Sequence, residues 1–332
     1  MILNNKGIGI LGTGKYVPEK VLTNHDLEKM VDTNDEWIRT RTGISERRIL
    51  EDDKATSFMA TEAARKAIED SGLSPEDIDL IIVSTVTPDM AFPSTACLVQ
   101  DNLGCTNAAA FDLEAACSGF LYGLSMAYGQ IFAGLVKNVL LIGAEALTRI
   151  TDWTDRNTCV LFGDGAGAAV LGEVPEGKGI LALNLGADGR GGKYLTQPAG
   201  GSLMPATKES VENRMHYIRM EGNEVFKFAV RTMADASMNV LEKANMEISD
   251  VDFLVPHQAN IRIINSSRKK LKLPKDKVVV NLNKYGNMSS ASIPVALDEA
   301  VKEGRIDNND NVILVGFGGG LTWGSCLLKW HK

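Results

Sequence analysis

The sequence has little of what marks nucleic-acid-binding or exported proteins. Its longest basic run is Arg268-Lys269-Lys270, and its 332 residues carry a net charge of −7. A chain of this balance is not expected to bind nucleic acid, although a local basic patch could receive an acidic protein partner. Residues Met1–Lys6 show no charged region followed by a long apolar core. We therefore expect no secretory signal and a cytoplasmic protein.

The cysteines are few and irregularly spaced. There are five, an odd number, and they form neither a CxxC pair nor the Cys/His spacing of a metal site: Cys97, Cys105, Cys117, Cys159 and Cys326. This pattern is typical of reduced thiols in a cytosolic protein. It predicts neither a disulfide framework nor a bound metal.

One charge-free stretch, Ala115–Val136, is long enough to cross a bilayer. However, it contains four glycines and the polar residues Ser118, Ser125 and Gln130, and it directly follows a strand-like run. We favour a buried central helix of a large α/β core, with a membrane span as the alternative. No membrane association is expected.

A faint internal repeat organises the chain. Lys66–Ile81 and Asn239–Leu254 both show a helix end, a short acidic turn and the start of an apolar strand, at an offset of 173 residues (239 − 66). Asn138–Ala144 and Asn311–Phe317 match at the same offset (311 − 138). Two matches at one spacing favour a duplicated α/β unit over chance similarity of amphipathic segments.

Local patterns agree with this duplication. An alanine-rich helical face runs over Thr56–Ser71 and stops at Gly72, and four short β-branched runs are typical of strands buried on both faces: Leu80–Thr85, Val139–Gly143, Phe253–Val255 and Val312–Gly316. They predict two packed sheets around buried helices. Pro175 and Gly177 interrupt the pattern, so we expect two halves, residues 1–174 and 175–332. The Gly-, Thr- and Ser-rich loops between residues 186 and 220 could cover a site.

Cys117 is the candidate nucleophile. It lies in Ala115-Ala-Cys-Ser-Gly119, where a strand-like run turns into the apolar helix. The positive end of a helix dipole favours the thiolate, so we expect a lowered pKa for this thiol. The alternative is a small buried apolar side chain, which is our interpretation of the other four cysteines.

Two segments of the second half could complete the site. His257 follows the run Phe253–Val255, at the strand end where open α/β sheets bind ligands, although a core histidine is the alternative. Asn287 lies in a polar turn before a helix, and this turn also contains position 290, the repeat equivalent of Cys117. The duplication therefore predicts one site shared by Cys117 and Asn287.

Two glycine-rich segments have different interpretations. In Phe317-Gly-Gly-Gly320 the backbone could approach a ligand and direct N–H groups to an oxyanion, with a tight hairpin as the alternative. Gly7–Gly12 formally matches the dinucleotide motif GxGxxG. No strand precedes it and Pro18 soon follows, so we interpret it as part of a strand and expect no nucleotide there.

Taken together, these residues resemble a known family. Cys117, His257 and Asn287, with the glycine-rich segment Gly316–Ser325, resemble the thiolase-fold condensing enzymes. Five further segments narrow the resemblance to the β-ketoacyl-acyl carrier protein synthases III: Asp35–Ile44, Thr154–Arg156, Phe162–Gly167, Gly222–Lys227 and His257–Asn260. The motifs extend from about residue 7 to residue 326. The resemblance implies a five-layered αβαβα fold and a homodimer.

It also implies a reaction. Cys117 would take an acyl group from acyl-CoA, and His257 and Asn287 would bind the thioester carbonyl of malonyl-acyl carrier protein while carbon dioxide leaves. The enolate would attack the acyl-cysteine, with the backbone N–H groups of Cys117 and Gly319 holding the oxyanion. This acyl transfer would initiate fatty acid synthesis without a metal or organic cofactor, coenzyme A thioester being a substrate.

The resemblance assigns binding residues as well. Trp37 and Arg156 would stack on adenine and Arg41 would meet the phosphates, and the coenzyme A contacts as a set are Trp37, Arg41, Arg156, Asn223, Phe226 and Asn260. The carrier protein would meet Lys227, Arg262 and Arg268. Phe92, in the loop Thr87–Pro93, would reach the acyl pocket of the partner subunit.

Two alternatives stay open. A starter-unit enzyme of polyketide or hydroxymethylglutaryl type would share Cys117, His257 and Asn287 but differ in its second substrate. The carrier-protein and coenzyme A motifs favour fatty acid initiation. The other alternative is a non-catalytic acyl-binding subunit, which the presence of all three residues disfavours.

Overall fold

The computed structural model describes residues 7–332, so Met1–Lys6, where no secretory signal is expected, lie outside the described residues. The strands of the first half are β1 (Gly7–Tyr16), β2 (Val21–Thr23), β3 (Glu46–Arg48), β4 (Leu80–Ser84), β5 (Ala109–Leu113), β6 (Val139–Ala146) and β7 (Asp164–Val174). Its helices are α1 (Asn24–Leu27), α2 (Asp35–Thr42), α3 (Thr56–Ser71), α4 (Thr95–Leu103) and α5 (Gly119–Phe132), with 3₁₀ turns η1 (Pro75–Asp77), η2 (Ala116–Ser118) and η3 (Leu147–Ile150).

The second half repeats much of this order. Its strands are β8 (Gly179–Ala187), β9 (Leu195–Thr196), β10 (Arg219–Met220), β11 (Phe253–Pro256), β12 (Asn311–Gly318) and β13 (Thr322–Lys329). Its helices are α6 (Lys208–Glu212), α7 (Gly222–Ala244), α8 (Ile261–Lys270), α9 (Leu282–Tyr285) and α10 (Ser292–Lys302). The 3₁₀ turns are η4 (Gly189–Tyr194), η5 (Ile248–Asp250) and η6 (Ser289–Ala291).

The two large sheets share a topology. The first has the order β1-β7-β6-β4-β5, in which β4 is parallel to both β6 and β5, and β7 is antiparallel to β6 and β1. The second has the order β8-β13-β12-β11, with β11 parallel to β12 and β13 antiparallel to its two neighbours. The second sheet thus reproduces four strands of the first, and in place of β5 a single parallel bridge links Leu254 of β11 to Val278.

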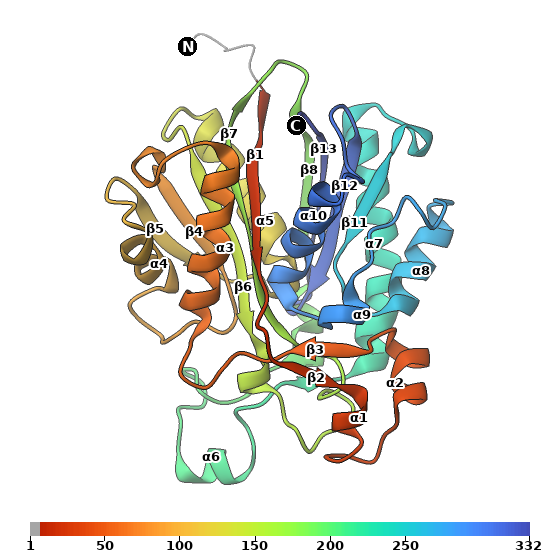
Figure 1. Cartoon of the computed structure of the whole chain (residues 1–332). Helices are drawn as coiled ribbons and strands as arrows, with labels where there is room; N and C mark the ends of the chain where they lie inside the picture. The colour runs from red at the N-terminus through yellow and green to blue at the C-terminus, as the bar shows by residue number, and fades with distance from the viewer. Residues whose placement is uncertain (1–6) are drawn as a thin grey trace.

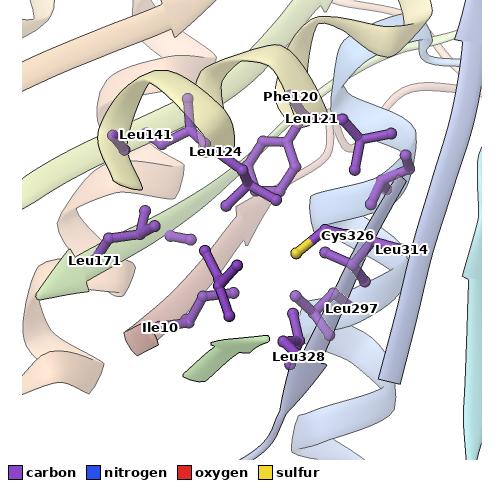
Figure 2. Packing of buried hydrophobic residues seen from close by; sticks show 14 of the residues in the cluster. Ile10, Phe120, Leu121, Leu124, Leu141, Leu171, Leu297, Leu314, Cys326 and Leu328 are labelled. Atoms are coloured by element: carbon purple, nitrogen blue, oxygen red, sulfur yellow. The ribbon is translucent and has the colours of Figure 1, made fainter. Parts of the chain in front are cut away.

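Helices fill the space between the sheets and cover their outer faces. α5 and α10 lie between the two sheets, whereas α3 and α4 cover the first sheet and α7 and α8 the second (Figure 1). The central cluster joins Phe120 and Leu124 of α5 to Leu297 of α10 and to Leu314 and Leu328 of the second sheet (Figure 2). This arrangement confirms the predicted five-layered, thiolase-like α/β fold.

The charge-free stretch forms the buried central helix that we expected. α5 is 14 residues long and buries one face. Within residues 7–332, no helix is long and apolar enough to cross a membrane.

The internal repeat is precise at the level of structure. η1 and η5, η2 and η6, and the first residues of α5 and α10 are each separated by 173 positions (248 − 75, 289 − 116 and 292 − 119). The duplication is therefore confirmed. β7 ends at Val174 and β8 begins at Gly179, and the division into two domains at this point stays a prediction.

The GxGxxG segment is a strand, as we interpreted it. β1 lies at the edge of the first sheet and pairs with β7. A Cβ atom at Gly12 would lie 2.4 Å from the carbonyl oxygen of Ala67. The glycine therefore lets α3 pack closely on this strand.

Candidate active site

Cys117 lies in the turn between β5 and α5, where the sequence predicted it. The 3₁₀ turn η2 runs directly into α5, and the preceding residue, Ala116, has a φ of 46°. A Cβ atom on Gly119 would come within 1.9 Å of the Ser84 hydroxyl, so only glycine lets this helix start so close to β4. The turn presents the thiol at the end of the buried helix.

Two cavities meet at Cys117. The first, of about 520 Å³, is lined by Cys117, Val86, Ser289 and Gly319, and also by Leu195, Thr196, Gln197 and Ile218 from the loops after β8, as predicted. The second, of about 300 Å³, is lined by Cys117, His257 and Asn287. Of the other four cysteines, three are buried, as we interpreted them, but Cys97 is exposed, so that interpretation was wrong for Cys97. None of the four lines either cavity.

The expectation of a lowered pKa at Cys117 was wrong. Burial raises the pKa of the Cys117 thiol to about 12, and the nearby carboxylates of Glu145 and Glu114 act in the same direction. An apolar enclosure without a cation disfavours the thiolate, and here it outweighs the helix terminus that we considered alone. The thiol is therefore neutral at rest.

His257 is buried and unpaired. It directly follows β11, where its backbone N–H donates to the carbonyl of Val315 at 2.8 Å. Neither ring nitrogen has a hydrogen-bond partner among the residues that the structure describes, and burial lowers the pKa of the imidazole to about 3. The ring is therefore neutral at pH 7 and offers one N–H donor and one acceptor.

Asn287, in contrast to His257, is held by hydrogen bonds of both its backbone and its side chain. Its backbone N–H donates to the carbonyl of Leu161 at 2.8 Å, and its carbonyl accepts from Gly163 at 3.1 Å. Its side-chain Oδ1 accepts from the backbone N–H of Ser289 at 2.8 Å. With Oδ1 engaged, Nδ2 is the group that this side chain offers to the second cavity.

The glycine-rich segment closes the site from the other side. A Cβ atom on Gly318 would lie 2.6 Å from the backbone nitrogen of Cys117, so the two backbones are in close contact. Thr322 ties them together, because its hydroxyl lies 2.7 Å from the Ser118 hydroxyl and donates to the carbonyl of Gly319 at 2.9 Å. Gly319 thereby lies in the wall of the first cavity beside Cys117.

Four of the six predicted coenzyme A contacts line the second cavity: Arg41, Asn223, Phe226 and Asn260. The other two, Trp37 and Arg156, lie outside its lining but next to it in the fold. The Arg156 guanidinium is 4.6 Å from the centre of the Trp37 indole, and that of Arg41 is 5.1 Å from it. Asn260 donates to the carbonyl of Arg41 at 3.1 Å, which links α8 to α2.

The three predicted carrier-protein contacts differ in their surroundings. Lys227 is exposed and pairs with Glu224 at 2.7 Å. Arg262 is exposed, lies over the Phe226 ring at 5.2 Å and also lines the second cavity. Arg268 is half-buried and donates to the carbonyl of Leu273 at 2.8 Å.

Phe92, the predicted acyl-pocket residue, borders neither cavity of its own chain. Its side chain is 85% exposed. Met90, in the same loop, is also 49% exposed.

Sequence reasoning missed two residues near the thiol, Ser289 and Glu145. Ser289 lines the first cavity and, like its repeat equivalent Ala116, has a positive φ, 45° against 46°. Glu145 is fully buried at the end of β6. The offset of 173 would have found Ser289, and an acidic residue ending an apolar strand was a signal for Glu145.

Two sheets packed around paired central helices, with a buried cysteine, histidine and asparagine where the helices begin, define a thiolase-like condensing enzyme. The 3-oxoacyl-[acyl-carrier-protein] synthase III models match residues 111–189 and, for the C-terminal part, 241–330. The β-ketoacyl-[acyl-carrier-protein] synthase III of Caldanaerobacter subterraneus subsp. tengcongensis is 62% identical over 324 residues, which is 98% of each chain. The chain therefore belongs to the β-ketoacyl-[acyl-carrier-protein] synthase III family of acyltransferases.

Solved structures agree. The 3-oxoacyl-[acyl-carrier-protein] synthase III of Aquifex aeolicus VF5 superposes with a TM-score of 0.91 at 51% identity, covering 98% of this chain and 100% of that one. The priming β-ketosynthase of the R1128 polyketide biosynthetic pathway also superposes with a TM-score of 0.91, at 35% identity, covering 100% of this chain and 98% of that one. The backbone thus resembles a polyketide enzyme as closely as a synthase III.

Proposed function

We propose that the protein condenses an acyl-CoA primer with malonyl-acyl carrier protein, releasing carbon dioxide and initiating fatty acid synthesis. The observation that carries this proposal is the position of Cys117 in the wall shared by two cavities. One can hold the acyl chain, and the other, which contains His257 and Asn287, can admit the pantetheine arm of either substrate.

In the first step the Cys117 sulfur attacks the thioester carbonyl of the primer. A sulfur–carbon bond forms, the bond to coenzyme A breaks, and the proton lost by Cys117 ends on coenzyme A, which leaves as its thiol. The backbone N–H groups of Cys117 and Gly319 are proposed to hold the oxyanion. Support comes from the close contact of the two backbones and from the bonds of Thr322 to this loop.

In the second step the malonyl group loses carbon dioxide. The electron pair of the broken carbon–carbon bond passes to the thioester, and His257 and Asn287 donate hydrogen bonds to the oxygen that becomes negative. A neutral imidazole and an amide are suited to this task, because both can donate to the carbonyl before charge develops. The enolate carbon then attacks the acyl carbonyl, the bond to Cys117 breaks, and the departing thiolate takes up a proton from water.

Substrate binding would use the surface around the second cavity. We assign adenine stacking to Trp37 and Arg156, the phosphates to Arg41, and the pantetheine arm to Asn223, Phe226 and Asn260. Lys227, Arg262 and Arg268 would receive the acidic carrier protein. Because Arg262 also lines the second cavity, it is the one carrier-protein residue proposed to meet pantetheine as well.

A homodimer is part of the proposal. β5 is an edge strand of the first sheet, and Phe111 on it is 36% exposed. The next residue, Asp112, accepts from the backbone N–H of Thr95, three residues after the exposed Phe92. A free edge strand with apolar side chains is suited to a two-fold contact. Light scattering of the purified protein tests this, since a stable monomer at micromolar concentration would remove the role of Phe92.

The second candidate function is a starter enzyme of polyketide synthesis, favoured by the TM-score of 0.91 with the R1128 priming enzyme. The experiment that tests the main proposal also addresses this one. The protein is incubated with a panel of acyl-CoAs and digested, and the mass of the Cys117 peptide is measured. Acylation followed by transfer to malonyl-acyl carrier protein from a fatty acid synthase supports the proposal. Absence of any acyl-Cys117 contradicts it. A cytoplasmic location stays a prediction.

A further inference from the structure

Glu145 is a buried acid that has no role in the steps of the proposed reaction. Its side chain is inaccessible to solvent and lies at the end of β6, between the two halves of the molecule. Within residues 7–332 no cation is paired with it, and its partners are hydroxyl and backbone N–H groups. A buried carboxyl group without a cation needs a function that offsets the cost of its burial.

One oxygen of Glu145 binds the segment that follows β4. Oε2 accepts from the backbone N–H of Val86 at 3.1 Å and from the hydroxyl of Thr87 at 2.9 Å, with Thr85 at 3.3 Å. Val86 is part of the wall of the first cavity. This half of the carboxyl group therefore holds one side of the proposed acyl pocket.

The other oxygen binds the second half of the chain. Oε1 lies 2.9 Å from the hydroxyl of Ser290, which is also 2.8 Å from the carbonyl of Ser84. A hydroxyl group has one hydrogen and can donate to only one of these two oxygens, so a proton on Oε1 can satisfy the contact with Glu145 when the hydroxyl donates to Ser84. The backbone N–H of Ser290 lies 3.4 Å from Oε1 and can donate to either form of the acid.

Glu145 is also close to the nucleophile. The hydroxyl of Ser289 interacts with both the Cys117 thiol and the Glu145 carboxyl group, and a charge on Glu145 acts against ionisation of the thiol. Ser289 lines the first cavity, and its backbone N–H holds Oδ1 of Asn287. The Glu145 side chain thus contacts two segments of the site. One contains Val86 of the pocket wall, and the other contains Ser289, which lies next to both Asn287 and the Cys117 thiol.

We propose that Glu145 is a positioning residue that acts as a neutral acid and joins the segment after β4 to η6 around Cys117. A negative charge on Glu145 would oppose formation of the Cys117 thiolate. The proposal concerns the same site as the proposed function and rests on Cys117 being its nucleophile. Burial raises the pKa of Glu145 to about 7, so both forms occur near neutral pH.

The groups facing this carboxyl come from three segments. The segment after β4 presents Thr85, Val86 and Thr87, and η6 presents Ser289 and Ser290. The ionisable neighbour is Cys117 of η2. Asp164 on the adjacent strand β7 pairs with Ala146, so its side chain lies on the opposite face of the sheet from Glu145, where it accepts from Leu50 and Thr148. Glu114 also acts on the Cys117 thiol.

The test follows the alkylation rate of Cys117 by iodoacetamide, peptide by peptide in a mass spectrometer, between about pH 6 and pH 9. Glu145→Gln keeps the shape of the protonated acid but cannot ionise. We expect it to match the unmodified protein at about pH 6 and to react roughly three- to tenfold faster at about pH 9, because no charge opposes the thiolate. Asp164→Asn is the matched control, a buried acid of raised pKa that contacts neither Ser289 nor Ser290, and it should follow the unmodified profile.

The unmodified protein provides a second measurement that no folding defect can affect. Its alkylation rate should rise with pH less steeply than a single ionisation requires, because Glu145 ionises in the same range. A single-ionisation curve, or identical profiles for the unmodified protein and Glu145→Gln, would overturn the proposal. Alkylation needs neither acyl-CoA nor carrier protein, so failure of the proposed function would leave this result intact.

Discussion

The two halves of the molecule build the same turn and place different chemistry on it. In the first half η2 leads into α5 and brings Cys117 to the wall of two cavities. In the second half η6 leads into α10, and the equivalent position, Ser290, is 1% exposed and bonded to Ser84 and Glu145. The residues before them, Ala116 and Ser289, have nearly the same positive φ, 46° and 45°.

The difference lies in what surrounds each turn. Around Cys117 the glycine-rich segment and the loops after β8 leave space, whereas around Ser290 the end of β6 fills it with a carboxyl group. The second half instead contributes His257 and Asn287, which face the thiol from the second cavity. The same backbone turn can therefore carry a nucleophile, as at Cys117, or a buried structural residue, as at Ser290. Which of the two it carries depends on the residues that the other half packs around it.

The largest expected effect is loss of the nucleophile of the first half. Cys117→Ser should reduce self-acylation by roughly three orders of magnitude or more, because a serine hydroxyl is a far weaker nucleophile in this enclosure. Decarboxylation of malonyl-acyl carrier protein should continue, since both donors of the second half remain. Radiolabelled acetyl-CoA and carbon dioxide release measure the two steps. Equal loss of self-acylation and decarboxylation would contradict the assignment of one step to each half.

The reverse pattern is expected in the second half. His257→Ala and Asn287→Ala should each slow decarboxylation by about 10²–10³-fold, the usual cost of removing one donor to a developing oxyanion. Acyl-Cys117 should still form in both variants. If His257→Ala abolishes acylation as fully as decarboxylation, His257 would be the base that activates the thiol, and the assignment of roles would change.

The two halves should contribute equally to the stability of the core, although they contribute different catalytic groups. Leu124 of α5 and Leu297 of α10 are repeat equivalents, both fully buried in the central cluster (Figure 2). Replacing either by alanine should lower the free energy of unfolding by about 2–5 kcal/mol, measured in urea. Met126→Ala, at a position 44% exposed on α5, should cost much less. A large effect on one side only would show that the halves do not share the core equally.

The smallest effect concerns the exposed surface of the second half. Lys227→Glu should raise KM for malonyl-acyl carrier protein roughly three- to tenfold, and added salt should have the same effect on the unmodified protein. KM for acyl-CoA should stay the same, because Lys227 is absent from the lining of the second cavity. Equal changes in the two constants would move this residue from the carrier-protein surface to the coenzyme A site.

Much of the site followed from sequence because its residues stand at fixed points of a repeated pattern. Cys117, His257 and Asn287 each follow or precede a recognisable strand or helix, and the ends of parallel strands meet at one edge of a sheet. Trp37 and Arg156 did not follow from any local pattern. Their stacking joins α2 to a loop over a hundred residues away, and only the family resemblance suggested it.

The sequence by itself determined the α/β class, the duplication at an offset of 173 and the helix start that presents Cys117, since these depend on local periodicity and on glycines such as Gly119. Only the tertiary structure decided the acid–base state of the site. The raised pKa of Cys117, the lowered pKa of His257 and the buried acid Glu145 all result from removing these groups from water. Desolvation depends on every element packed around a group, which no single stretch of sequence encodes.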